Sequence, residues 1–409
     1  MKKRSKSAQR IICNAHFHAY ITYTTRKLQK LNRGCFMLIS TKIAKLDRSV
    51  LFLTTCLVGV GTVAIYEATT DTRLDGLYIS YLYLFALFCL PMLFIALVDY
   101  KILLGRLAYL FYGVGIGLLV LVKLVGENLN GAVRWLSIGS FQLQPSELAK
   151  ICTVLLIAHL LGTREGQQLR FFQDLVPVCF VFLIPFILIM DQPDLGTALV
   201  FAGILLSMLW IGNIRALYMI LILGVVIISI GTILWLYYAN FDLLSKIVEP
   251  HQLSRIQAFL DPQSDPDKSW HVKNAMIAIG SGGLSGSEGI FLRKGYIPYA
   301  YSDSIYVVIG GKYGFIGSSV LLMLYLLLVY RMIFIALDSR DRAGTYIVTG
   351  FIAMFIFQVS VNLGMHIGLL PLTGISLPFI SYGGSSLLTN MIAIGMVLSV
   401  KVHKDESTD

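Results

Sequence analysis

Long apolar runs recur along almost the whole sequence, and they limit what the chain can fold into. A run of about 20 apolar residues is long enough to cross the hydrocarbon core of a bilayer as a helix. Of all residues, 56% are hydrophobic and only 14% are charged, whereas soluble domains carry roughly 25% charged residues. The sequence therefore predicts an all-α, polytopic membrane protein and excludes a soluble globular fold. Ten spans are expected, near residues 49–68, 77–98, 106–126, 147–163, 174–190, 195–212, 214–239, 303–333, 343–367 and 382–401.

The basic residues predict how these spans are oriented. The formal net charge is +10, and the basic side chains gather in the N-terminal tail and in the loops on the same side as that tail. By the positive-inside rule, this pattern predicts a multi-pass protein of the plasma membrane with both termini in the cytoplasm. We interpret the charge as a topology signal and as contact with anionic membrane lipids, not as a nucleic-acid interface. The loop residues are Lys101, Arg106, Arg164, Arg170, Arg215, Arg331, Arg340, Arg342, Lys401 and Lys404.

Three segments follow from this topology. Residues 1–48 are basic and lack apolar periodicity, which predicts a disordered cytoplasmic tail rather than a signal peptide. Residues 49–402 are expected to form a single transmembrane domain, and residues 403–409 a short cytoplasmic tail. Within the domain, residues 238–303 form a large hydrophilic loop between the seventh and eighth spans, expected on the extracytoplasmic side. None of the six cysteines lies in a CxxC pair, so neither a metal knuckle nor a disulfide framework is expected.

Two cations lie in a polar segment around the start of the fourth span. Lys150 falls within the span, where a charge costs at least ~2.5 kcal/mol and is functional by default. Glu147 is three residues earlier on the same helix face, so one interpretation is a Glu147–Lys150 pair that reaches the interface. The other is that Lys150 and Arg134 face a cavity and bind an anion, Arg as a bidentate fork and Lys as a point charge. Trp135 is either an interfacial anchor or a stacking surface for a sugar.

Two carboxylates stand at the starts of predicted helices. Asp194 precedes the sixth span, where it is either a helix N-cap or part of a binding site. Asp303 stands at the start of the eighth span and follows an aromatic, glycine-rich approach at residues 295–299. A carboxylate at the membrane–water boundary beside a loop with cations such as Arg255 suits a general base for a hydroxyl nucleophile. The glycine run at residues 280–286 is either an anion-binding nest or a flexible loop.

Five motifs occur in order along residues 45–402: GAVRW at 131–135, QPSELAK at 144–150, QPDLGTA at 192–198, AIGSGGL at 278–284 and LPFISYGGSS at 377–386. With this order and hydropathy, the chain resembles the SEDS family (shape, elongation, division and sporulation), the RodA/FtsW/SpoVE group of bacterial cell-wall polymerases. The Gln-Pro-Asp form of the third motif resembles the RodA branch more than the FtsW branch.

The resemblance implies a peptidoglycan glycosyltransferase that polymerises lipid II into β-1,4 glycan strands for elongation, division or sporulation. It implies release of undecaprenyl pyrophosphate, with Asp303 in the place of the essential aspartate. On physical grounds, Arg134 and Lys150 are then expected to hold the pyrophosphate and to stabilise the charge that develops on it. The resemblance further implies a class B penicillin-binding protein as partner. No firm cofactor is expected, although a divalent cation (Mg²⁺ or Mn²⁺) on the pyrophosphate is compatible with this chemistry. The candidate substrate contacts are Arg134, Trp135, Glu147, Lys150, Asp194, Arg255, Ser381, Tyr382, Gly383 and Gly384.

The chain departs from the family pattern close to the expected active site. Tyr301-Ser302 replaces the usual His-Thr before the aspartate, and Gly311-Lys312 replaces an element that is normally acidic. Lys312 lies inside the eighth span without a predicted partner. Two alternative functions therefore stay open: a transporter of lipid II or another lipid-linked sugar, and a weakly catalytic scaffold that recruits a penicillin-binding protein.

Overall fold

The computed structural model describes residues 40–129, 132–139, 141–261, 263, 266–287 and 297–404. The chain divides into two units, Met1–Leu46 and Asp47–Asp409. The first is described only over residues 40–46, which begin as a short helical segment. Most of the predicted tail, residues 288–296 of the predicted loop and residues 405–409 lie outside the described residues. The second unit holds every element below.

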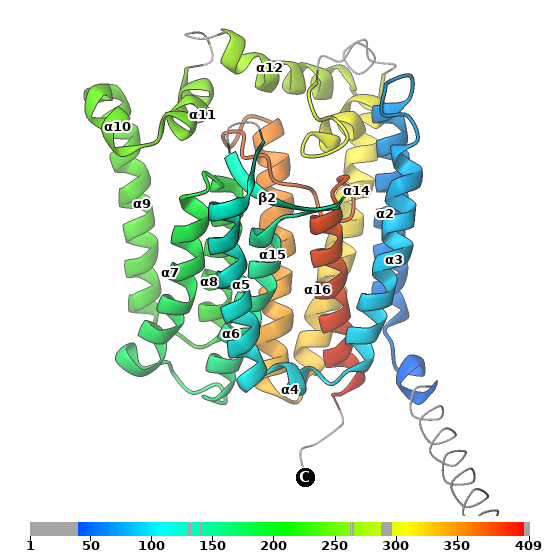
Figure 1. The fold of residues 1–409 in the computed structure, drawn as a ribbon, viewed down its shortest axis with the longest axis vertical. Helices are drawn as coiled ribbons and strands as arrows, with labels where there is room; N and C mark the ends of the chain where they lie inside the picture. The colour runs from blue at the N-terminus through cyan, green and yellow to red at the C-terminus, as the bar shows by residue number, and fades with distance from the viewer. Residues whose placement is uncertain are drawn as a thin grey trace, which may run out of the picture. The chain divides into compact units, whose positions relative to one another are not determined.

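Ten apolar helices of the second unit match the ten predicted spans (Figure 1). Among the described residues, nine are long and apolar enough to cross a membrane. The exception is α8, whose 17 residues still fall within the roughly 17–25 that a spanning helix needs. The helices are α2 (Arg48–Thr69), α3 (Leu77–Leu97), α5 (Arg106–Val125), α6 (Pro145–Gly162), α7 (Val176–Met190, preceded by the π-helical turn η1, Phe171–Leu175), α8 (Leu195–Ile211), α9 (Ala216–Ala239), α14 (Ile305–Asp338), α15 (Arg342–His366) and α16 (Gly384–Val402).

Side-chain caps explain where several of these helices begin. Asp47 accepts hydrogen bonds from the main-chain N–H groups of Ser49 and Val50 at the start of α2. Asp341 does the same for Ala343 at the start of α15. These contacts satisfy main-chain donors that have no partner inside the helix. The polar residue before each apolar run thus fixes the first turn.

The burial of the helices separates the centre of the unit from its periphery. In α16, 78% of the most apolar stretch is buried, whereas in α9 only 11% is. The helices α15 and α6 are also mostly buried, and α6 packs against both α15 and α16. The exposed side chains of α9 are almost all apolar, for example Ile227, Ile228 and Trp235. An apolar face of this length fits contact with lipid.

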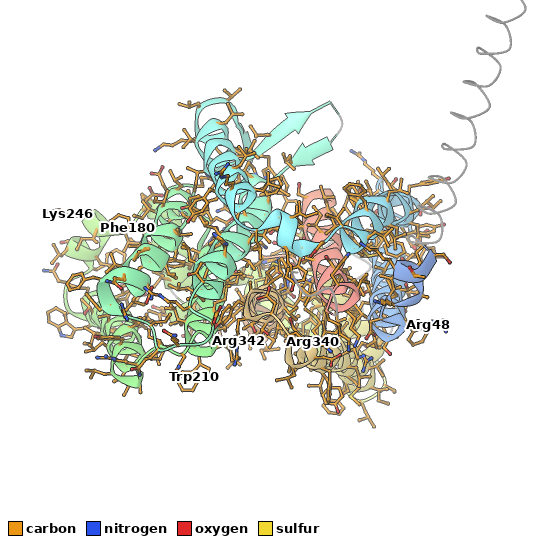
Figure 2. All side chains as sticks on the ribbon, turned by 90° about the horizontal axis from the view of Figure 1, so that it is seen from below. Arg48, Phe180, Trp210, Lys246, Arg340 and Arg342 are labelled. Carbon is orange, nitrogen blue, oxygen red and sulfur yellow. The ribbon has the colours of Figure 1, made fainter. Side chains whose placement is uncertain are left out.

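The basic loops predicted to share one side do lie at one end of the helices. The short helix α4 (Tyr100–Leu103) connects α3 and α5 at this end, and the chain leaves α16 here too (Figure 1). Figure 2 views this end, with Arg48, Arg340 and Arg342 labelled. Lys401 and Lys404 both pair with Asp338 at 2.8 Å. Because consecutive spans alternate in direction, every second loop lies at the same end of the helices. The cations of those loops therefore gather at this end.

A small sheet at the other end of the helices was not predicted. Its strands are β1 (Glu127–Leu129), β2 (Ala132–Ile138) and β3 (Phe141–Leu143), antiparallel in the order β1-β2-β3. In the second pair, Leu136 lies opposite Leu143. Gly139, with φ of 65°, allows the tight turn between β2 and β3. The fold remains that of a helical membrane protein, but this polar segment is a sheet.

Within its described residues, the long hydrophilic loop forms the helices α10 (Phe241–Ile247), α11 (Pro250–Leu260) and α12 (Pro266–Ser281). The glycine run after α12 packs on α14, which has non-helical backbone at Gly314 (φ 61°). A Cβ atom at Gly282 would lie 2.1 Å from the carbonyl oxygen of Gly310. The main-chain N–H of Phe315 donates to the carbonyl of Gly283 at 2.9 Å. Glycine here permits close contact between two backbones.

Candidate functional site

Asp303 stands just before α14 and is half-buried. Its Oδ1 atom is buried and has no hydrogen-bond partner among the described residues. Its Oδ2 atom faces Gly374, where an added Cβ would lie 3.6 Å from it. The main-chain carbonyl of Asp303 accepts hydrogen bonds from Asn362 Nδ2 at 2.8 Å and from His366 Nε2 at 3.0 Å. The main chain is therefore held while one carboxylate oxygen stays available.

The environment of Asp303 prepares its carboxylate to accept a proton. Burial raises the pKa of Asp303 to about 6. Hydrogen bonds from the main-chain N–H groups of Asp303 and Ser304 partly offset that rise, and the positive charge of Arg255 adds a smaller offset. A base works best when its pKa lies near the working pH, because it is then both ionised and basic enough to take a proton. A carboxylate with this pKa is mostly ionised at pH 7 and is more basic than a solvated one.

Arg255 comes from α11 in the long loop and reaches the same place. Its Nη1 donates to the carbonyl oxygens of Leu372 at 3.0 Å and Thr373 at 3.1 Å. Burial lowers the pKa of Arg255 and the charge of Arg134 lowers it further, whereas Asp194 and Asp303 raise it. Arg255 thus lies within electrostatic reach of Arg134, Asp194 and Asp303, and these four side chains are called the charged cluster below.

Arg134 and Asp194 form the other half of the charged cluster. Arg134, on β2, donates from Nε to the carbonyl of Gln192 at 2.8 Å and from Nη2 to the carbonyl of Pro193. Its Nη1 lies 3.8 Å from Asp194 Oδ1. Asp194 also caps α8 by accepting from the N–H of Thr197 at 3.2 Å. It is therefore both a helix cap and a member of the cluster.

Trp135 follows Arg134 on β2 and is half-buried. Successive side chains of a strand point to opposite faces, so Trp135 and Arg134 do not share a face of the sheet. The two interpretations of Trp135, as an interfacial anchor or as a stacking surface for a sugar, stay predictions.

Glu147 and Lys150 are paired and sealed inside the protein. Lys150 Nζ lies 2.8 Å from Glu147 Oε1, and the side chains are 0% and 3% exposed respectively. Pairing of these two residues was one of the interpretations of the sequence, but the pair is buried between helices instead of reaching an interface. Glu147 Oε2 has no hydrogen bond among the described residues. An anion-binding role for Lys150 stays a prediction.

The polar residues before α16 contact the segment that leads to Asp303. Ser381 Oγ donates to the carbonyl of Ser302 at 2.7 Å. The N–H of Tyr382 donates to the carbonyl of Tyr301 at 2.9 Å, and the two tyrosine rings lie 6.1 Å apart. Gly383 and Gly384 form the start of α16. These residues lie beside Asp303, and substrate contact by them stays a prediction.

Asn362 is a residue of this site that the sequence did not single out. For His366, near the end of the ninth predicted span, the sequence favours a hydrogen-bonded histidine at the membrane interface over a catalyst. Both are fully buried on α15, one helical turn apart. A polar residue inside a membrane span is a functional signal in itself, and the spacing of four would have placed both on one face. Neither the polarity of these residues nor their spacing predicts that both side chains donate to the carbonyl of Asp303.

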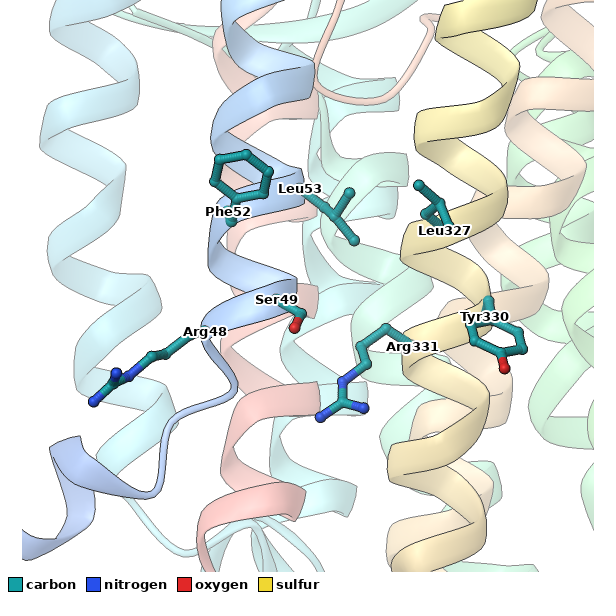
Figure 3. Close-up of a pocket in the computed structure, with 7 residues that line it drawn as sticks. All are labelled: Arg48, Ser49, Phe52, Leu53, Leu327, Tyr330 and Arg331. Carbon is teal, nitrogen blue, oxygen red and sulfur yellow. The ribbon is translucent and has the colours of Figure 1, made fainter.

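A cavity of about 390 Å³ lies elsewhere, between α2 and α14 (Figure 3). It is lined by Leu53, Leu327 and Arg331 among others, and Arg331 pairs with the capping residue Asp47 at 2.8 Å. Arg331 follows the start of α14 by 26 residues, so at roughly 1.5 Å per residue it is far from Asp303. This cavity has no part in the charged cluster.

The described residues do not supply a metal centre made of protein ligands. No group of three His, Cys, Asp or Glu side chains gathers among them. A divalent cation carried on a pyrophosphate needs only one or two carboxylates. In the charged cluster, Asp194 is engaged by Arg134, Thr197 and Gln144, whereas Asp303 keeps an oxygen without a partner among the described residues. A divalent cation held on the pyrophosphate stays a prediction.

Comparison with known proteins gives consistent matches over most of the chain. Residues 48–406 match the family model described as "Cell cycle protein", FtsW/RodA/SpoVE. Stage V sporulation protein E of Bacillus subtilis is 32% identical over 380 residues, covering 88% of this chain and 98% of the relative. The "Probable peptidoglycan glycosyltransferase FtsW" of Trichlorobacter lovleyi is 32% identical over 371 residues, covering 88% and 94%.

A solved structure agrees with these matches. A chain from a structure titled "Structural coordination of polymerization and crosslinking by a peptidoglycan synthase complex" superposes with a TM-score of 0.73 at 30% identity, covering 88% of this chain and 99% of that one. The family predicted from the five motifs is confirmed. This chain belongs to the FtsW/RodA/SpoVE family of multi-pass membrane proteins.

Proposed function

We propose that this protein is a peptidoglycan glycosyltransferase that polymerises lipid II into β-1,4-linked glycan. The observation that carries the proposal is the environment of Asp303. This half-buried carboxylate has one oxygen without a partner among the described residues, lies beside Arg255, and has a pKa raised to about 6. The activity named for the FtsW relative supports the reaction class. Asp303, predicted from the sequence as the essential aspartate, is proposed as the catalytic base.

In the proposed reaction, the 4-hydroxyl of the acceptor sugar attacks the anomeric carbon of the donor. The bond from that carbon to the pyrophosphate breaks with inversion, and undecaprenyl pyrophosphate leaves with the electron pair. Asp303 takes the proton from the attacking hydroxyl, as a base does for water in inverting glycosidases. The proton must then pass to solvent or product before the next turnover.

Negative charge that develops on the leaving pyrophosphate is met by guanidinium groups. Of the two cations expected there, Arg134 lies in the charged cluster, whereas Lys150 is sealed against Glu147. We assign the second position to Arg255, whose loop contacts hold it next to Asp303. Preorganised donors of this kind stabilise charge in the transition state more than in the ground state.

Both termini and the basic loops are proposed to be cytoplasmic, with α10–α12, the sheet and the charged cluster on the extracytoplasmic face of the plasma membrane. The gathering of cations at the opposite end supports this orientation. The partner is proposed to be a class B penicillin-binding protein, which would cross-link the glycan. The matched chain belongs to a complex whose title joins polymerisation with crosslinking.

The experiment is polymerisation of lipid II by the purified protein together with its transpeptidase, with Asp303→Ala as the control. Glycan from the wild type and none from the variant supports the proposal. Movement of labelled lipid across vesicles without polymer would favour the transporter instead. Absence of both activities, with transpeptidase binding retained, would favour the scaffold.

A further inference from the structure

Three successive main-chain carbonyls before α14 accept hydrogen bonds from other parts of the chain. The carbonyl of Tyr301 accepts from the N–H of Tyr382, and the carbonyl of Ser302 accepts from the hydroxyl of Ser381. Asp303 is held by Asn362 and His366 on α15. A loop residue commonly leaves such carbonyls to water. Here each of the three residues 301–303 is held by a hydrogen bond to its carbonyl. The donors lie in two places, the segment just before α16 and the helix α15.

The two contacts to Asp303 are specific in their chemistry. A carbonyl oxygen only accepts, so His366 must carry its proton on Nε2. Asn362 Nδ2 is shared between the carbonyl of Asp303 at 2.8 Å and the carbonyl of Ile375 at 2.7 Å. The Asn362 side chain thus links the Asp303 segment to the loop that contains Gly374, which faces the Asp303 carboxylate.

These contacts come at an energetic cost. His366 Nδ1 and Asn362 Oδ1 are buried without a hydrogen-bond partner among the described residues. Burying an unpaired polar atom costs on the order of 1–3 kcal/mol. Apolar side chains of similar size would fill the same space without that cost. A requirement for a fixed position of Asp303 explains why Asn362 and His366 are polar despite this cost to the stability of α15.

We propose that Asn362 and His366 are positioning residues that hold the main chain of Asp303, so that its carboxylate meets the acceptor hydroxyl. This inference rests on the proposed function. With the Asp303 main chain fixed, only the two side-chain torsions remain to place the carboxylate. A misplacement of about 1 Å costs on the order of 100-fold in rate, so the hydrogen bonds act on turnover more than on substrate binding.

The test compares variants that remove or keep the donor. His366→Met and Asn362→Leu remove the hydrogen bond at nearly constant volume, whereas His366→Gln keeps an N–H that can reach the carbonyl. We expect kcat for lipid II polymerisation to fall by roughly 10–100-fold in the first two variants. KM should change by less than about 3-fold, since the substrate contacts are intact. His366→Gln should recover most of the wild-type kcat.

Gln358 provides a matched control on the same helix. It lies one turn before Asn362, is fully buried, and its side-chain atoms contact no hydrogen-bond partner among the described residues. Gln358→Met should leave kcat within about 2-fold of the wild type. Thermal unfolding in detergent is recorded for every variant, so that a loss of folded protein is separated from a loss of turnover.

Each outcome decides one question. A wild type that makes no polymer would overturn the proposed function. A wild type that polymerises, with kcat unchanged in both His366→Met and Asn362→Leu, would overturn the positioning role alone. An equal loss of kcat in Gln358→Met, or no recovery with His366→Gln, would mean that any buried polar change on α15 has this effect, and would also overturn it.

Discussion

The Glu147–Lys150 pair and the charged cluster show two ways of keeping charge in a membrane protein. Lys150 finds its partner one turn away on its own helix, and both side chains are almost wholly buried. The charged cluster draws its four members from β2, the α7–α8 junction, α11 and the start of α14. Asp303 keeps an oxygen without a partner among the described residues. A local, sealed pair neutralises its own charges, whereas charges gathered from distant segments are suited to a ligand.

The largest expected effect comes from breaking the buried pair. Lys150→Met leaves Glu147 as an uncompensated buried charge, which typically costs about 3–5 kcal/mol. Glu147→Leu alone should be comparably harmful, whereas the double variant should regain most of the stability, because two apolar side chains need no partner. Chemical unfolding of the purified protein in detergent measures these differences.

The same double variant tests whether Lys150 also binds substrate. If the pair serves stability alone, the double variant recovers polymerisation together with its resistance to unfolding. If the double variant regained stability but stayed inactive, Lys150 would be needed for substrate binding at the pyrophosphate. The buried pair and the charged cluster would then not differ in function.

Removing a member of the charged cluster should act on turnover instead. Arg255→Gln removes a guanidinium that we assign to the leaving group, and loss of such a donor costs on the order of 100-fold in rate. Arg255→Lys keeps the charge but removes the planar guanidinium, whose Nη1 donates to the Leu372 and Thr373 carbonyls, so it should recover only part of the rate. The measurement is kcat/KM for lipid II polymerisation.

Lys246 is the matched control for Arg255. It is an exposed cation on the neighbouring helix α10 (labelled in Figure 2). Lys246→Gln should leave kcat/KM within about 2-fold. An equal loss in both variants would mean that the loop needs only positive charge, and the assignment of Arg255 to the leaving group would be wrong.

The pH dependence should report the ionisation of Asp303. Its pKa is raised to about 6, and the reaction needs the ionised form, so kcat/KM should fall about 10-fold per pH unit below that value. The charge of Arg255 lowers the pKa of Asp303, so Arg255→Gln should move this acid limb to higher pH. Rates between pH 5 and 8 measure both effects. An acid limb near pH 4, or one unmoved in the variant, would contradict the assignment.

The spans and the main catalytic candidate could be predicted from the sequence because both depend on local properties. Apolar length defines a span, and Asp303 stands where a polar segment meets an apolar run. Burial is not local: the spacing of Glu147 and Lys150 allowed a pair, but whether the pair is sealed depends on the helices that pack against α6, among them α5 and, far along the chain, α15 and α16. The partners of Asn362 likewise depend on how α15 packs. The sheet at residues 127–143 was missed because strands this short depend on pairing, not on periodicity.

The smallest effect is expected where an ion pair is neither sealed nor part of the charged cluster. Lys312 of α14, for which the sequence offered no partner, pairs with Glu67 of α2, and the side chains are 38% and 22% exposed. Glu67 lies in the last turn of α2, so this partly exposed pair is close to the end of the helices, where such pairs contribute about 0.2–1 kcal/mol. Lys312→Gln should therefore lower the free energy of unfolding by less than about 1 kcal/mol and leave polymerisation unchanged. If this variant lost as much stability as Lys150→Met, the cost of breaking an ion pair in this protein would not depend on how exposed the pair is.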